Sequence, residues 1–506
     1  MSVDQAALPS GSVVSRAWKT LPDTARVAIG IFAFITIWTT FHAISHGMRA
    51  INDDTAEAYV WGQQFEWGFW KHPPFWAWIA GAWFDVFPRN VASIALLASV
   101  NAAIGLVGAW KLTGCFLRDE SRASATVLLL LTPLYTFLAF TFNANSIFIP
   151  LWPWTAYFFV RAIDRQSFGA SILFGAMAAI DMMSKYYAAI LIVTCIAAAM
   201  IHSARKACMR SMLPWLSAAT AALLFAPHLY WLAHSNYATL HYFGRETGHG
   251  AVFVVRQLAV LIGECIAYNA VAAVFVMAVT RTSPADWLSR FRERVRDSRF
   301  RFLAVLALLP AGLTLICSVL FRVSISSNTM IGVFCLTPVL FLDLAAPADP
   351  AKLQRASFVA VGLVTVASLL AAPALASLGT RDLAFTRSIA QQLDLLWTAN
   401  AHTPLRYVAG AEPYSEKMAF YLPERPQDFI LYNFAAAPWV TPGDLARNGF
   451  AAVCPSQDAR CIANARKFAP ARLVEKTILL PGRKHNAANT SETFTLIAAL
   501  PKETSR

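Results

Sequence analysis

Three carboxylates lie close together in one polar segment of the chain: Asp53, Asp54 and Glu57. A carboxylate in such a place can act as a general base that takes a proton from an attacking hydroxyl or amine. Lys71 and His72 follow in the same segment, and cations of this kind can neutralise a phosphate leaving group. The combination favours group transfer from a phosphate-linked donor. The alternative is an acidic interfacial loop that is merely solvated.

Five tryptophans accompany these charges, at positions 61, 67, 70, 76 and 78. Tryptophan collects at membrane–water interfaces, where its ring spans the polar and apolar layers. Pro73 and Pro74 end any helix or turn that precedes them. The segment is therefore predicted to lie on a membrane surface, where a donor anchored in the bilayer could reach it.

The composition of the rest of the chain predicts that it spans a membrane. Of its 506 residues, 57% are hydrophobic and only 14% are charged, whereas soluble domains carry about 25% charged residues. Apolar runs long enough to cross the hydrocarbon layer recur, and in lipid such runs must be helical. We predict a polytopic α-helical protein with about 11 transmembrane helices. The spans are expected near residues 26–44, 91–113, 123–140, 147–160, 168–182, 187–201, 212–232, 251–280, 302–320, 330–344 and 358–377.

The formal net charge of +13 fits this topology. If residues 1–25 are cytoplasmic, the basic residues outside the C-terminal region fall mostly in cytoplasmic segments, including the dense run 290–301. We therefore expect a bacterial inner-membrane protein that binds lipid and not nucleic acid. No cleavable signal peptide is expected, since the first apolar stretch is long and lacks a small-residue cleavage site.

An odd number of spans places the C-terminal region outside the cell membrane. We predict a transmembrane domain over residues 26–378, with an external loop at 45–89, and a periplasmic domain over residues 379–506. In the latter, short apolar runs alternate with turns, which is typical of a small α/β domain. These runs lie at residues 405–408, 429–432, 451–453, 473–480 and 494–499.

The predicted periplasmic domain contains no recognisable catalytic constellation. Glu412, Glu416 and Asp428 are interpreted as surface charges. Cys454 and Cys461 frame a short loop, and an oxidising periplasm favours a disulfide between them.

The segment from residue 53 to residue 78 resembles the first external loop of the GT-C glycosyltransferases. It is most similar to bacterial relatives of the protein O-mannosyltransferases and of the lipid A aminoarabinose transferase, the glycosyltransferase family 39 type. The matching residues are Asp54, Ala56, Trp61, Trp67-Gly68-Phe69 and His72-Pro73-Pro74. Thr55 departs from the family, which usually has Glu there, so Asp53, Asp54 and Glu57 all stay open as the base. Counting back from His-Pro-Pro favours Asp54.

Further segments share the resemblance. Asn143 and Asn145 stand where relatives carry a polar pair at the same surface, and helix capping is the alternative explanation for both. Lys185 and Tyr186 resemble a family turn between adjacent spans. Lys185 would contact the lipid phosphate there, or its long side chain would simply reach the interface.

Residues 227–249 are similar to the end of the seventh family span and the loop after it. The resemblance implies that Lys71, His72 and Lys185, or Arg245, bind the donor phosphate and stabilise it as it departs. The implied substrate-binding residues are Tyr59, Trp61, Asn143, Asn145, Tyr186, His234 and Tyr237. The spacing of His234, His241 and His249 matches no common ligand pattern, so we expect no metal ion.

The resemblance implies an inverting glycosyltransferase that acts as a monomer. Its donor would be a polyprenyl-phosphate-linked sugar, without further cofactor. Its acceptor would be lipid A or lipopolysaccharide, another lipid or glycan, or a protein. The chain has no glycine-rich nucleotide loop, which argues against a nucleotide-sugar donor. A transporter or lipid flippase is the alternative, although we find no pair of related halves; an envelope assembly protein is a third.

Overall fold

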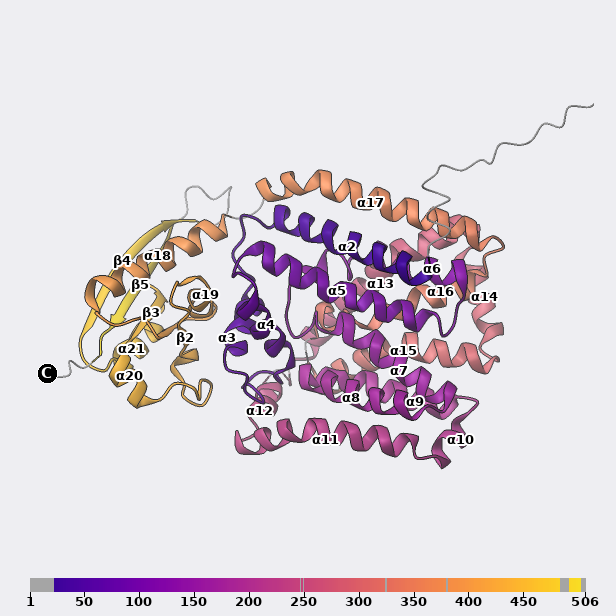
Figure 1. Cartoon of the computed structure of the whole chain (residues 1–506), viewed down its shortest axis with the longest axis horizontal. Coiled ribbons are helices and arrows are strands. Elements are labelled where there is room, and N and C mark those ends of the chain that lie inside the picture. Colours follow the sequence, from indigo (N-terminus) through magenta and orange to yellow (C-terminus); the bar gives the residue numbers. More distant parts are fainter. Residues whose placement is uncertain are drawn as a thin grey trace, which may run out of the picture.

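The computed structural model describes residues 22–245, 247–248, 250–323, 325–378, 381–482 and 491–501. A bundle of helices is followed by a C-terminal domain that covers one end of it (Figure 1). We refer to the end that this domain covers as the domain end of the bundle. Most of the predicted N-terminal segment, and His249 of the predicted loop, lie outside the described residues.

Six of the described helices are long and apolar enough to cross a membrane. They are α2 (Asp23–Ser45), α5 (Val91–Thr113), α11 (Leu213–His234), α13 (Ala251–Thr280), α15 (Ser298–Phe321) and α17 (Pro350–Leu378). Their outward faces carry large apolar side chains that a membrane would cover. The chain is thus a multi-pass helical membrane protein, as predicted.

Shorter helices fill the bundle between these six: α7 (Phe148–Arg165), α8 (Phe168–Ser184), α9 (Ala189–Ile201) and α16 (Thr337–Ala345). At the opposite end of the bundle lie α10 (Arg205–Arg210) and α14 (Pro284–Arg294).

Two of the predicted spans do not form single helices, so the prediction is wrong for them. The run 123–140 breaks into α6 (Asp119–Leu128) and the short 3₁₀ turns η1 (Leu129–Leu131) and η2 (Leu138–Phe140). Thr132 is extended because the ring of Pro133 excludes the helical conformation for the residue before it. The run 330–344 is likewise split, into η4 (Ser327–Met330), η5 (Val333–Leu336) and α16.

Two short helices occupy the domain end of the bundle: α3 (Asp53–Gly62) and α4 (Phe75–Val86). Their backbones touch at Gly62 and Gly81, where a Cβ on either glycine would overlap backbone atoms of the other. Only glycine permits this approach. The contact fixes the position of α3, the helix that carries all three candidate bases.

Gly81→Ala is expected to destabilise the protein by about 1–3 kcal/mol, because the added methyl group would force the two helices apart. Gly30→Ala in α2 is the matched control, since a Cβ there meets no atom within 4 Å. Thermal unfolding of both variants in detergent checks the prediction. An unchanged midpoint for Gly81→Ala would show that the two helices can separate freely.

The C-terminal domain contains a five-stranded mixed sheet. The strands are β1 (Tyr407–Gly410), β2 (Gln427–Asp428), β3 (Phe450–Pro455), β4 (Leu473–Pro481) and β5 (Ser491–Ala499), in the order β2-β1-β3-β5-β4. β1 pairs in parallel with β2 and β3, and β5 runs antiparallel to β3 and β4. The helices are α18 (Asp382–Asn400), α19 (Tyr414–Tyr421), α20 (Pro442–Asn448) and α21 (Ala459–Phe468). The predicted mixed α/β domain is therefore present.

Three acids of this domain were predicted to be surface charges. Glu412 is partly exposed, with 28% of its side chain accessible. Glu416 and Asp428 are buried, with exposed fractions of 3% and 0%, so their prediction as surface charges is wrong. Asp428 accepts a hydrogen bond from the Ser415 hydroxyl at 3.0 Å, and burial raises its pKa to about 8. Cys454 and Cys461 are joined in a disulfide.

Candidate active site

Asp54 lies in the first turn of α3, at the domain end of the bundle. The side chain of Asn52 begins the helix by accepting a hydrogen bond from the Asp54 backbone N–H at 3.0 Å. The Thr55 hydroxyl donates to the carbonyl of Phe142 at 2.9 Å. Asp54 is exposed whereas Thr55 and the residues after it are buried. Its carboxylate is thus held on a fixed helix end and remains open to a substrate.

Asn143 contacts this carboxylate from the bundle. Its side-chain N–H donates to Oδ2 of Asp54 at 2.8 Å. Its side-chain oxygen accepts from the backbone N–H groups of Asn145 and Ser146 at 2.9 and 2.8 Å. Asn143 therefore caps the turn, and the capping bonds orient its amide toward Asp54.

Lys185 completes the same line of polar groups. It lies between α8 and the 3₁₀ turn η3 (Tyr186–Ala188), and its ammonium donates to Oδ1 of Asn145 at 2.7 Å. Burial lowers the pKa of Lys185 to about 8, although the carboxylates of Asp54 and Glu57 act in the opposite direction. Segments from three distant parts of the sequence thus bring together Asp54, Asn143, Asn145 and Lys185.

Glu57 and Lys71 form a pair beside this line. Lys71 Nζ lies 2.8 Å from Glu57 Oε1 and 3.6 Å from Oε1 of Glu412 in the C-terminal domain. Burial raises the pKa of Glu57 to about 7. Lys71 therefore forms ion pairs with two carboxylates. Among the described residues, no carboxylate forms an ion pair with Lys185.

His72 lies against the rings of Trp61, Trp76 and Tyr242. Burial and the neighbouring charges of Lys185 and Lys71 hold its pKa well below the ordinary value. His72 is therefore neutral at physiological pH, and it can orient a phosphate only through a hydrogen bond.

Asp53 points toward the C-terminal domain, where its carboxylate lies 2.8 Å from Nζ of Lys417. Tyr59 and Trp61 are almost fully buried. Tyr59 packs on Phe420 and accepts a hydrogen bond from Gln63, and Trp61 stacks on Phe69. Tyr59 and Trp61 thus pack inside the protein, and Asp53 pairs with the C-terminal domain.

Tyr186 belongs to a second hydrogen-bonded chain. Its hydroxyl lies 2.7 Å from Nε2 of His228, and Nδ1 of His228 lies 2.6 Å from the carbonyl of Trp67. His228 donates to that carbonyl and accepts from the Tyr186 hydroxyl. His228 was not among the predicted site residues; its signals were its place next to Pro227 and within the segment 227–249 that resembles the family.

His234, Tyr237 and Arg245 lie outside the cluster and are exposed. Nδ1 of His234 is 2.8 Å from the carbonyl of Tyr230, one turn earlier in α11. Arg245 lies 5.7 Å from the Trp70 ring, at the rim of the loop. Over the part of the chain that the structure describes, no group of His, Cys, Asp and Glu has the arrangement of a metal site.

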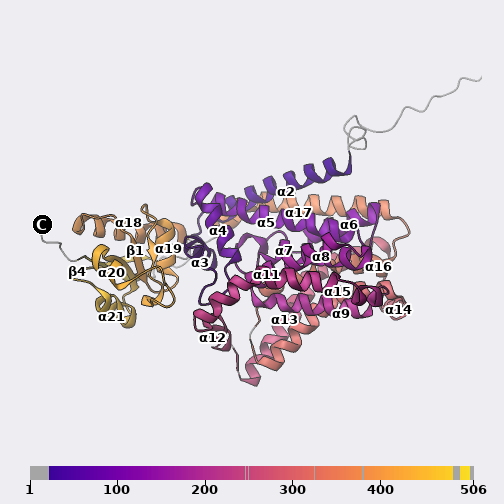
Figure 2. The same ribbon diagram turned by 60° about the horizontal axis from the view of Figure 1, so that its bottom comes forward.

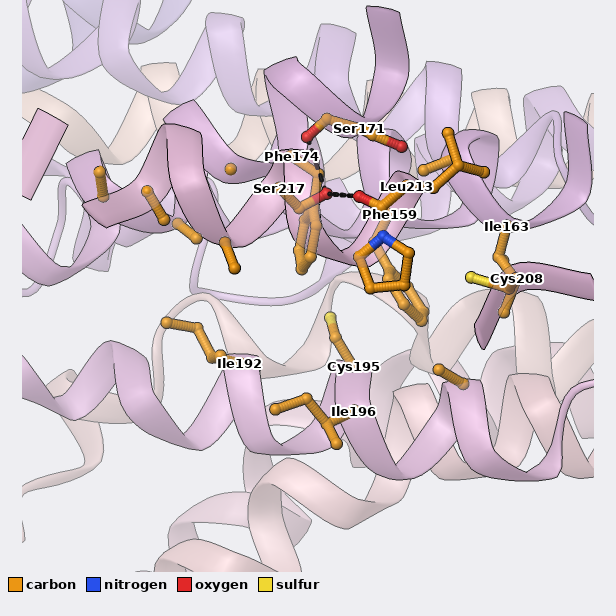
Figure 3. A pocket seen from close by; sticks show the side chains of 18 of the residues that line it. Phe159, Ile163, Ser171, Phe174, Ile192, Cys195, Ile196, Cys208, Leu213 and Ser217 are labelled. Carbon is orange, nitrogen blue, oxygen red and sulfur yellow. Dashed lines mark hydrogen bonds between the residues drawn. The ribbon is translucent and has the colours of Figure 1, made fainter. Parts of the chain in front are cut away.

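An apolar cavity of about 510 Å³ lies between α7, α8, α9 and α11. Figure 3 shows its wall, in which the hydroxyl of Ser217 is bonded to the carbonyls of Ser171 and Leu213 and leaves the lining apolar. Met182 lines one end, three residues before Lys185, and Arg205 lines the other. The cavity thus begins about one helical turn before Lys185 along α8.

The resemblance to a glycosyltransferase family was tested by comparing the chain with known proteins. Residues 71–231 match the profile of the dolichyl-phosphate-mannose-protein mannosyltransferase family. The resemblance inferred from the sequence is confirmed. The match begins after α3, so it includes Lys71, Asn143, Asn145 and Lys185 but not Asp54.

One curated relative is the lipopolysaccharide core galacturonosyltransferase RgtB of Rhizobium johnstonii, which is 26% identical over 232 residues. The match covers 43% of this chain and 44% of that protein, so the chain matches less than half of its relative's length.

Among solved structures, the fold is similar to that of ArnT from Cupriavidus metallidurans. With ArnT bound to undecaprenyl phosphate, the TM-score is 0.52 at 13% identity, covering 96% of this chain and 100% of ArnT. With apo ArnT the TM-score is 0.50, also at 13% identity, covering 94% and 98%. At this level of identity the likeness concerns the fold.

Proposed function

We propose that the chain is an inverting glycosyltransferase that moves a sugar from a polyprenyl-phosphate donor to an acceptor in the cell envelope. The observation that carries the proposal is the line from Asp54 through Asn143 and Asn145 to Lys185. It sets an exposed carboxylate and a partly buried ammonium on one surface, above an apolar cavity. The similarity to a mannosyltransferase family and to the ArnT fold supports the same reaction.

In this reaction an acceptor hydroxyl or amine attacks the anomeric carbon of the donor sugar. Asp54 takes the proton from the attacking group as the new glycosidic bond forms. The bond between the anomeric carbon and the phosphate oxygen breaks on the opposite face, which inverts the configuration. Polyprenyl phosphate leaves with the bonding electrons, and Lys185 stabilises its negative charge.

The other polar residues take supporting roles. Asn143 orients Asp54, and Asn145 holds the Lys185 ammonium. Tyr186, whose hydroxyl donates its proton to His228, can accept a hydrogen bond from a hydroxyl of the sugar. Lys71 is assigned to holding Glu57, since its contacts are carboxylates on both sides.

The apolar cavity is proposed to hold the first part of the polyprenyl tail. It begins below Lys185, so a phosphate on that ammonium would place its tail at the mouth. The lining residues of α8 run from Ser171 to Met182, a length of about 16 Å at 1.5 Å per residue. ArnT, whose fold this chain shares, binds undecaprenyl phosphate.

Ala218→Phe, which places a ring in the cavity, is expected to raise the KM for the lipid donor about 10-fold or more, because it removes apolar contact with the tail. Ala219→Phe is the matched control. Both alanines are exposed on α11, but Ala218 lines the cavity and Ala219 lies outside its wall. Donor titrations on membranes check the prediction, and equal KM values for the two variants would contradict it.

We further propose that the protein lies in a bacterial inner membrane, with the C-terminal domain in the periplasm. The shorter helices α7, α8, α9 and α16, with the broken segment 119–140, would bring the crossings to about 11. The acceptor is proposed to be lipopolysaccharide or another envelope lipid, because RgtB acts on the lipopolysaccharide core.

A transferase and a transporter leave the polyprenyl-phosphate sugar in different final states. Membranes containing the chain are incubated with a polyprenyl-phosphate sugar fraction and unmodified envelope glycolipid. A transferase releases polyprenyl monophosphate in equal amount to the sugar that the glycolipid gains. A transporter leaves the donor intact on the other side of the membrane, and that result would overturn the proposal.

A further inference from the structure

The start of α3 is held from two sides, by the C-terminal domain and by the helix bundle. On the side of the C-terminal domain, the backbone N–H of Ile51 donates to the Tyr421 hydroxyl at 2.9 Å, and Asp53 pairs with Lys417 at 2.8 Å. Lys417 and Tyr421 are one turn apart on α19, which packs directly against α3 (Figure 2).

On the other side, the bundle holds Asp54 through Asn143 and Thr55 through the carbonyl of Phe142. The backbone that carries Asp54 is thus clamped between the two domains.

Two more contacts cross the same interface. Lys71 extends from the loop to Glu412, at 3.6 Å. Arg89 donates from the bundle to the carbonyls of Phe420 and Leu422, at 2.7 and 3.1 Å, where α19 ends. These last carbonyls of a helix carry partial negative charge, which the guanidinium complements. The position of α19 relative to the bundle is therefore fixed at both ends of the helix.

We propose that Lys417 is a positioning residue for Asp54, so that the C-terminal domain completes the active site. The proposal rests on the glycosyl transfer proposed above. The Lys417 side chain is only 6% exposed, whereas Asp53 is 59% exposed. In its own domain the ammonium lies 4.0 Å from Oδ2 of Asp382, and it reaches out to hold an otherwise solvated carboxylate next to the base.

Lys417→Met is expected to lower the turnover number about 10- to 100-fold, because small displacements of a reacting group cost rate steeply. The KM for the lipid donor is expected to stay the same, since the cavity and Lys185 are untouched. Lys417→Arg, which keeps the charge, is expected to recover most of the activity. Lys476→Met is the control, because Lys476 bonds to Gln392 inside the C-terminal domain.

The assay uses the full chain in membranes at equal abundance, a polyprenyl-phosphate sugar fraction from the source strain, and the unmodified glycolipid of a deletion strain. Lys417→Met is also combined with Asn143→Ala. If both residues act by positioning Asp54, the double variant loses less activity than the product of the two single losses.

The inference is overturned by an unchanged turnover number in Lys417→Met, or by single losses that multiply in the double variant. A merely structural role predicts equal losses for Lys417→Arg and Lys417→Met, and that result overturns it as well. Absence of transfer by the wild-type protein contradicts the proposed function instead, so the two failures are distinguishable.

Discussion

Asp54→Asn lowers the rate of sugar transfer by about 10²–10⁴-fold, the expected loss for removal of a general base. The amide keeps the size of the side chain and can still contact Asn143, but it accepts no proton from the attacking group. Protein abundance and thermal stability stay near wild type, because Asp54 is exposed. Initial rates at saturating donor and acceptor measure the effect.

Asp85→Asn is the matched control for this variant. Asp85 is an exposed carboxylate of the same loop region, near the end of α4, and its loss leaves the rate unchanged. Glu57→Gln tests the competing base. If Asp54→Asn keeps full activity while Glu57→Gln loses it, the base is Glu57, and the line from Asp54 to Lys185 has another purpose.

Lys185→Met lowers the turnover number by about 10²–10³-fold, the usual cost of losing one group that stabilises charge in the transition state. A lysine that merely reached the membrane surface would contribute nothing to the rate. Arg245→Met is the comparison, since Arg245 is exposed at the rim of the loop and its loss changes the rate far less.

The pH dependence follows from the same residue. With a pKa of about 8, Lys185 is charged below that pH and neutral above it. The value of kcat/KM therefore falls as the pH rises through about 8, since this parameter reports groups of the free enzyme. In Lys185→Arg the fall moves to higher pH, because a guanidinium stays charged. A decline at the same pH in Lys185→Arg would assign it to another group.

Long apolar runs were the most predictable part of the fold. The observed bounds of α5 and α13 match the predicted residues 91–113 and 251–280. Such runs have one low-energy state in lipid, a continuous helix, so the sequence alone determines them. The runs 123–140 and 330–344 failed because the surrounding protein satisfies their backbone groups, which permits a broken helix inside the bundle.

Part of the candidate site was also predictable. The family resemblance, counted back from His-Pro-Pro, selected Asp54, and the structure places Asn143 and Lys185 in the same hydrogen-bonded line. The sequence did not reveal that Lys71 contacts Glu412, or that Glu416 is buried, because both depend on the C-terminal domain docking against the loop. Contacts between segments more than 300 residues apart leave no periodic signal.

The central claim is that the chain transfers a sugar to an envelope molecule. The most direct measurement compares, by mass spectrometry, the envelope glycolipids and glycoproteins of a deletion strain carrying the wild-type chain or no chain. We predict that one molecule loses a single sugar mass on deletion and regains it with the wild type, and that molecule is the acceptor. If deletion shifts the mass of no glycolipid or glycoprotein, the account is contradicted, and transport or envelope assembly takes its place.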